Sequence, residues 1–250
     1  MDRHFSCIAC GKCCAGWLPL SINDALENAN LFPLFLLWTP VRQGAKSFDL
    51  TAKIGFTLKL KNRKLAAVRL TPMSYIPPQI NCPALSEDNL CSIHERKPLR
   101  CSTMPFSASR DENDQIDLLI PRPGWECDIS DNAPLVYKDK KISNPDGFLS
   151  ERKQLLTDSE ILKPFAQLML DSKPALKMEL EKMAVRPHGG NVVVGFLPLI
   201  HRLANVDINQ FAASQLAVLE NLIGITKENP ECADAHKNYV QAAGELRAII

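Results

Sequence analysis

The chain has 250 residues, of which 46% are hydrophobic and 23% are charged, and its formal net charge is +1. This composition is that of an ordinary globular protein, long enough for one large domain or two small ones. The near-zero net charge provides no long-range field toward nucleic acid or an anionic membrane, so neither is expected as a partner.

The sequence also predicts where the protein resides. No apolar run separates Met1 from the first cysteine, which indicates that there is no signal peptide. The longest apolar stretch, residues 31–38, contains Pro33 and is far shorter than the roughly 20 residues of a membrane-spanning helix. We therefore expect a cytoplasmic protein, and a reducing cytosol disfavours structural disulfides.

The first predicted element is a loop with four cysteines in eight residues. They are Cys7, Cys10, Cys13 and Cys14. Gaps of two residues let a tight turn direct successive thiolates at one point, and Gly11 permits the positive φ that other residues resist. Packing alone does not require so many thiols in one loop, so the sequence predicts a metal-binding loop.

A helix and a β-hairpin are expected next. Ser21 and Asp24 are typical of a capping box and predict a helix over residues 22–30. Alternating apolar residues over 54–60, followed by an apolar run over 65–70, predict a hairpin with a polar turn at 61–64.

The middle of the chain contains four more cysteines. They are Cys82, Cys91, Cys101 and Cys127. An extended linker over 75–79 precedes the first, and a helical turn over 91–97 ends at Pro98. A strand is predicted over the apolar residues 116–120.

From about residue 148 the pattern becomes helical. Helices are predicted over 148–172, 174–185, 195–205, 209–223 and 230–249. Asp207 is placed to cap one of them and Pro230 to occupy a first turn. The only cysteine in this half, Cys232, is expected to be a structural thiol.

The predicted fold is therefore α+β. A cysteine-rich, metal-binding N-terminal half with short hairpins and helices precedes an all-helical C-terminal half. The expected organisation is a metal-binding domain at 1–130, a connector at 131–147, and a helical domain or extension packed on the first at 148–250.

Eight clustered thiols in a reducing compartment indicate metal ligands rather than disulfides. Thiolates are soft ligands that select zinc, iron–sulfur clusters or copper(I). Zinc takes four per site, so eight could fill two sites, and a four-iron cluster also takes four. Neighbouring side chains point to opposite sides of an extended backbone, so Cys13 and Cys14 could serve two metals, or one of them could face the core.

Several motifs occur together in the first half of the chain. They are Cys-x2-Cys-Gly-x-Cys-Cys, Cys-Pro-x-Leu, Cys-x-Ile-His-Glu-x-Lys-Pro-x-x-Cys and Pro-Phe. Over about residues 5–127 this combination resembles the YkgJ-type CxxCxxCC cysteine-cluster family, which is described as a zinc- or iron-chelating domain. The resemblance implies the ligands Cys7, Cys10, Cys13, Cys14, Cys82, Cys91, Cys101 and Cys127. The chain departs from the family pattern at His94, where Tyr is common, and at Lys97, where Arg is common.

A few other side chains lie among these thiols. His94 could be a zinc ligand or could donate to a thiolate, although a ring packed on a helix face is the more ordinary interpretation. Cations near an anionic thiolate cluster would ease its charge, so Arg96 and Arg100 are candidate cofactor-binding residues. No catalytic residue is predicted, since neither a nucleophile elbow nor a phosphate-binding glycine loop is found.

The sequence thus predicts a cytosolic protein that binds iron or zinc through cysteines. The preferred cofactor is an iron–sulfur cluster, of the 4Fe-4S type, or iron, with zinc as the alternative, for redox or metal-handling work. A structural-zinc scaffold that docks a partner protein stays open. So does a protein lysine N-methylase-like enzyme, because a related cysteine pattern occurs in flagellin lysine N-methylases. A protein or redox partner is expected.

Overall fold

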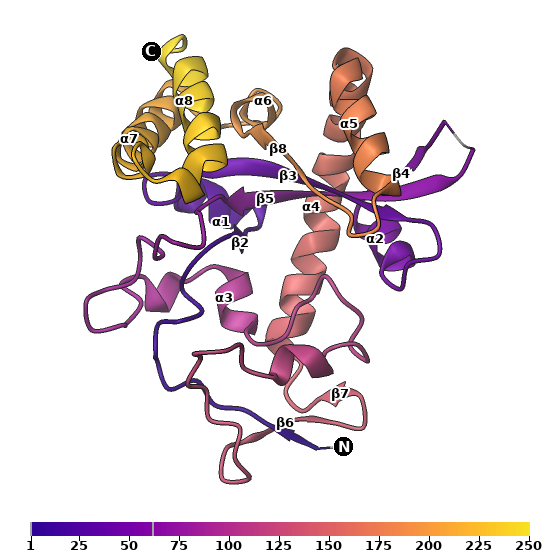
Figure 1. Cartoon of the computed structure of the whole chain (residues 1–250), viewed down its shortest axis with the longest axis vertical. Coiled ribbons are helices and arrows are strands. Elements are labelled where there is room, and N and C mark those ends of the chain that lie inside the picture. The colour runs from indigo at the N-terminus through magenta and orange to yellow at the C-terminus, as the bar shows by residue number, and fades with distance from the viewer. Residues whose placement is uncertain (1, 62) are drawn as a thin grey trace.

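The computed structural model describes residues 2–61 and 63–250 (Figure 1). Its strands are β1 (Arg3–His4), β2 (Leu18–Pro19), β3 (Leu34–Arg42), β4 (Phe56–Lys59), β5 (Leu65–Ser74), β6 (Leu135–Lys138), β7 (Lys141–Ile142) and β8 (Val192–Gly195). Its α-helices are α1 (Ile22–Glu27), α2 (Phe48–Ile54), α3 (Leu99–Thr103), α4 (Asp146–Ser172), α5 (Pro174–Val185), α6 (Leu197–Ile200), α7 (Ile208–Thr226) and α8 (Ala233–Arg247). Short 3-10 helices are η1 (His94–Arg96), η2 (Ile116–Leu119) and η3 (Pro230–Cys232).

A five-stranded antiparallel sheet crosses the upper half of the molecule in the view of Figure 1. Its strand order is β2–β5–β3–β8, and β4 also pairs with β5. Strands β3 and β5 pair from Leu34 opposite Ser74 to Arg42 opposite Ala66. Most of β3 is buried, which explains why its sequence is an apolar run rather than an alternating pattern.

The predicted hairpin is confirmed as the pairing of β4 with β5, with Phe56 opposite Val68. It begins two residues later than predicted because Ile54 ends helix α2. A Cβ added to Gly55 would lie 2.1 Å from the Val68 carbonyl oxygen, so the helix approaches the strand this closely only with glycine there. Residue 62, within the predicted polar turn, lies outside the described residues.

The predicted capping box at α1 is confirmed. The Ser21 hydroxyl accepts a hydrogen bond from the Asp24 amide at 2.9 Å, and the Asp24 carboxylate accepts one from the Ser21 amide at 3.2 Å. Two further amides bind carboxylates here: Ile22 donates to Asp158 of α4 at 2.9 Å, and Leu99 of α3 donates to Asp24 at 3.4 Å. Helix α1 therefore ties α3 to α4. It ends at Glu27, earlier than predicted.

The helical character of residues 146–247 is confirmed, including the bounds predicted for α5. Asp207 caps α7 by accepting a hydrogen bond from the Gln210 amide at 3.0 Å. The helix predicted over 195–205 is limited to α6, and the strand β8 that precedes it was not predicted. Its three consecutive valines suit an edge strand, which pairs with β3.

The strand predicted over 116–120 is wrong, because most of this segment forms the 3-10 helix η2. The completely buried side-chain amide of Gln115 donates to the carbonyls of Ser107 and Asp111 and curls the chain here. These hydrogen bonds are not part of a strand ladder. The apolar character of residues 116–120 therefore does not predict them.

The largest hydrophobic core contains side chains from both halves of the chain. It joins β3 and β5 to α4, α5, α7 and α8. A smaller core surrounds Phe106, Tyr137 and Phe148 near the N-terminal end of α4. Within the described residues, none of the helices combines the length and apolar character needed to cross a membrane.

Candidate metal centre

The N-terminal cysteine loop is attached at one end beside Cys127. Ser6 and Asp128 exchange two backbone hydrogen bonds, of 2.8 and 3.0 Å. Cys7 and Cys127 are the direct neighbours of this pair in sequence. The loop therefore starts where the last clustered cysteine lies, although about 120 residues separate the two in the chain.

The other end of the loop is attached beside Cys82. Ala15 pairs with Asn81, and the Cys82 amide donates to the Cys14 carbonyl at 2.8 Å. Cys91 is brought to the same place, because it forms a β-bridge with Leu85 in the turn that follows Cys82. The fold thus brings distant cysteine segments together.

Cys101 comes from helix α3, whose first amide donates to Asp24 of α1. Burial raises the pKa of Cys101 to about 12, and the neighbouring thiols of Cys82 and Cys91 act in the same direction. These influences indicate that the three thiols lie within electrostatic range of one another.

Cys13 and Cys14 share a hydrogen bond between their side chains. This bond lowers the pKa of Cys13 to about 6, and it raises the pKa of Cys14, as do burial and the nearby Cys82 and Cys101. One proton is held between two adjacent sulfurs, since two neighbouring thiolates repel each other. Cys13 therefore ionises more readily than Cys14.

The thiols fall into two neighbouring groups. Burial raises the pKa of Cys127, and the other influences on it come from Cys10, Cys7 and Cys13. Cys14 is influenced first by Cys13 and then by Cys82 and Cys101, and Cys13 also acts on Cys82 and Cys101, so Cys13 lies where the two groups meet. We call Cys14, Cys82, Cys91 and Cys101 the inner group, and Cys7, Cys10, Cys13 and Cys127 the outer group. Cys7 and Cys13 of the outer group are exposed, whereas every member of the inner group is partly enclosed.

The side chains of these groups do not converge fully. Among the described residues, no three Cys, His, Asp or Glu side chains are placed closely enough to hold a metal ion. The donor set nevertheless fits zinc or iron chemically, because eight soft sulfur ligands gather in one region. Coordination would require these thiols to turn toward common centres.

Gly11 fixes the path of the loop between the two groups. Its φ is +72°, and a Cβ at this position would lie 2.8 Å from the Asn89 side-chain oxygen. The loop therefore packs directly on the turn that precedes Cys91. Only glycine meets both conditions without strain.

We expect Gly11→Ala to weaken metal binding about tenfold, because forcing alanine into the left-handed region costs roughly 1–2 kcal/mol and the Asn89 contact adds to it. Competition with a chelator would measure this. Gly44→Ala is the matched control: its φ is +85°, but nothing lies within 4 Å of the added Cβ. Equal metal affinities in the two variants would contradict the role of Gly11.

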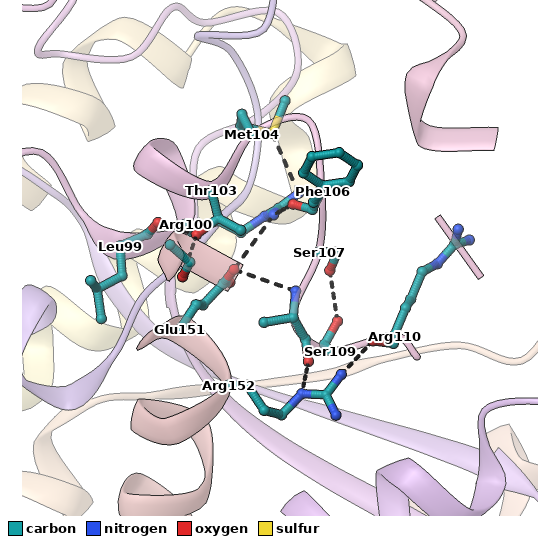
Figure 2. Close-up of polar contacts among 12 residues, drawn as sticks. Leu99, Arg100, Thr103, Met104, Phe106, Ser107, Ser109, Arg110, Glu151 and Arg152 are labelled. Atoms are coloured by element: carbon teal, nitrogen blue, oxygen red, sulfur yellow. Dashed lines mark hydrogen bonds and ion pairs between the residues drawn. The ribbon is translucent and has the colours of Figure 1, made fainter. Parts of the chain in front are cut away.

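The two predicted cofactor-binding arginines differ in their surroundings, and Arg100 is the one held by side-chain contacts. Its guanidinium lies 3.8 Å from the Glu151 carboxylate, donates to the Phe106 carbonyl, and contacts the Met104 sulfur at 3.3 Å (Figure 2). Burial lowers its pKa, while the charges of Glu151 and Cys101 oppose this effect. Arg96 is exposed on η1, and His94 is also exposed.

Glu151 was not identified from the sequence. It lies in the first turns of α4, is 7% exposed, and accepts a hydrogen bond from the Ala108 amide at 3.3 Å. Its neighbour Arg152 donates to the carbonyls of Ala108 and Arg110 (Figure 2). Together they fasten the segment after Cys101 to the helical half. The sequence around Glu151 is that of any glutamate in a helix, so this role could not be predicted from it.

The fold and the gathered thiols define an α+β protein with a cysteine-rich region built around a multi-segment thiol cluster. The family model CxxCxxCC, described as "Putative zinc- or iron-chelating domain", matches residues 6–119. The resemblance predicted from the sequence is thereby confirmed for somewhat less than half of the chain, and it supports zinc or iron binding in general. Seven of the eight clustered cysteines lie inside the match, and Cys127 lies beyond it.

No curated protein matches the chain, and neither does any solved structure.

Proposed function

We propose that this chain is a cysteine-ligated iron protein with two adjacent centres and a redox or metal-handling role. The observation that carries the proposal is the meeting of thiols from three distant segments in one region, supported by the family match. Each group has four thiols, which is the number that a four-iron cluster or a zinc ion takes.

The inner group suits an iron–sulfur cluster. Its four sulfurs are partly enclosed, and enclosure limits the access of water and oxidants. When bound, such a cluster supplies one-electron transfer. The side chains of Cys14, Cys82, Cys91 and Cys101 would hold it, and the enclosed Arg100 beside Cys101 would offset part of its negative charge.

The outer group suits an exchangeable metal. Cys7 and Cys13 are exposed, so an incoming ion can reach them directly. Because Cys13 and Cys14 are adjacent and hydrogen bonded, occupation of one group alters the charge felt by the other.

The test is anaerobic purification followed by analysis of iron, acid-labile sulfide and zinc, together with an absorbance spectrum. We expect iron and sulfide in about equal amounts, with charge-transfer absorption that disappears on chelation. A protein that is fully folded and free of metal would overturn the proposal.

One observation favours a second candidate, a structural-zinc module. The segment from Ile76 to Pro98 contains no strand and only one short 3-10 helix, η1, among its described residues. Thiol-rich loops of this kind often depend on metal for their fold. Zinc without sulfide, and unfolding of the loop on chelation, would favour this candidate over the iron–sulfur one.

A further inference from the structure

An arginine on the central strand β5, Arg69, has no hydrogen bond or ion pair among the described residues. Arg69 as a whole is half-buried, and its Nε atom is fully buried. Its Nε–H has no acceptor within the described part of the chain, and its terminal N–H groups are not among the fully buried atoms. Arginine keeps its charge at physiological pH, so a full positive charge is left unpaired.

The nearby carboxylate does not serve as its partner. Glu151 acts on Arg69 electrostatically, but its oxygen accepts from the Ala108 amide and lies 3.8 Å from Arg100. Arg100 also repels Arg69. The guanidinium groups of Arg69 and Arg100 therefore share a single carboxylate, that of Glu151. The net charge of these three side chains is positive.

A second unpaired group lies next to Arg69. The hydroxyl of Thr71, two residues along β5, is buried and has no hydrogen-bond partner. Residues two apart on a strand present their side chains on the same face. Buried polar groups in proteins are nearly always paired, so two unpaired neighbours on one face indicate a missing acceptor.

We propose that Arg69 and Thr71 form a binding site for a small oxyanion, the carboxylate or phosphate group of a small molecule. The guanidinium fork matches two oxygens of either group. The Thr71 hydroxyl donates to a third oxygen of a phosphate, or shares one of the two oxygens of a carboxylate. Access is open in part, because Arg69 is not fully buried. The site adjoins Arg100, which precedes Cys101, so the bound anion lies beside the inner thiol group. This proposal does not depend on which metal the thiols hold.

The test is a titration of the purified full chain, in its as-isolated metal state, with sodium phosphate and separately with sodium acetate, each against sodium chloride at equal ionic strength. Calorimetry and thermal unfolding report binding. We expect at least one oxyanion to bind and to raise the unfolding temperature more than chloride does. The stronger of the two identifies a phosphate or a carboxylate ligand.

Arg69→Met is expected to lower the affinity at least tenfold. Arg247→Met removes a surface arginine paired with Glu220 and is expected to leave binding unchanged. If Arg69→Met does not fold, Arg69→Lys and Thr71→Val replace it, and each is expected to bind more weakly than the wild type. No preference for either oxyanion over chloride, or unchanged binding in the folded variants, would overturn the proposal.

Discussion

Cys101→Ala is expected to empty the inner centre while the outer centre still binds metal. Cys101 is partly enclosed, and burial raises its pKa to about 12. It is the cysteine that helix α3 contributes to the inner group. Removing one of four thiolates should lower metal affinity by more than about a hundredfold, beyond the 10–100-fold cost of changing an outer-shell partner. Metal content per chain and the absorbance spectrum would show the loss.

Two further variants make this result specific. Cys232→Ala removes a thiol that is 1% exposed and lies outside the cluster, so metal content should stay at the wild-type value. Cys127→Ala should affect only the outer centre, because the influences on Cys127 come from Cys7, Cys10 and Cys13. Equal metal losses in Cys101→Ala and Cys232→Ala would contradict the assignment.

Gln215→Leu is expected to destabilise the whole chain by roughly 2–4 kcal/mol. The Gln215 side chain is 2% exposed and lies on α7. It accepts from the Leu34 amide at 2.9 Å and donates to the carbonyls of Phe32, at 2.8 Å, and Ala29. Leucine has a similar size but leaves three buried backbone groups unpaired. Denaturant unfolding would measure the change.

Gln210→Leu on the same helix is the matched control. Gln210 is exposed, so its replacement should change the unfolding free energy by less than about 0.5 kcal/mol. Because Gln215 joins the helical half to the start of β3, we also expect a single unfolding transition in the wild type. Equal stabilities of the two variants would show that this connection contributes little.

Local patterns explain why parts of the structure could be predicted. Ser21 and Asp24 define the start of α1 through contacts between residues three apart, and Asp207 caps α7 in the same way. The spacing in the first cysteine loop likewise belongs to neighbouring residues, and it indicated a metal-binding region before the fold was known.

The features that were missed depend on contacts distant in sequence. Strand β8 forms because β3 offers an edge; its three valines favour a strand, but only this pairing between distant segments fixes one. Glu151 and Arg69 are single charged residues in a helix and a strand, and only the approach of α3, α4 and β5 gives them a role. The meeting of the segments that carry Cys7 and Cys127 follows from the pairing of Ser6 with Asp128, more than a hundred residues apart.

The central claim is that cysteine sulfurs from the three segments bind metal. X-ray absorption at the metal edge, on protein purified without added metal, measures the ligand atoms and their distances. The account predicts a first shell of sulfur alone, at about 2.3 Å when the metal is zinc. A first shell of nitrogen and oxygen would contradict it, since the gathered thiols would then not be the ligands.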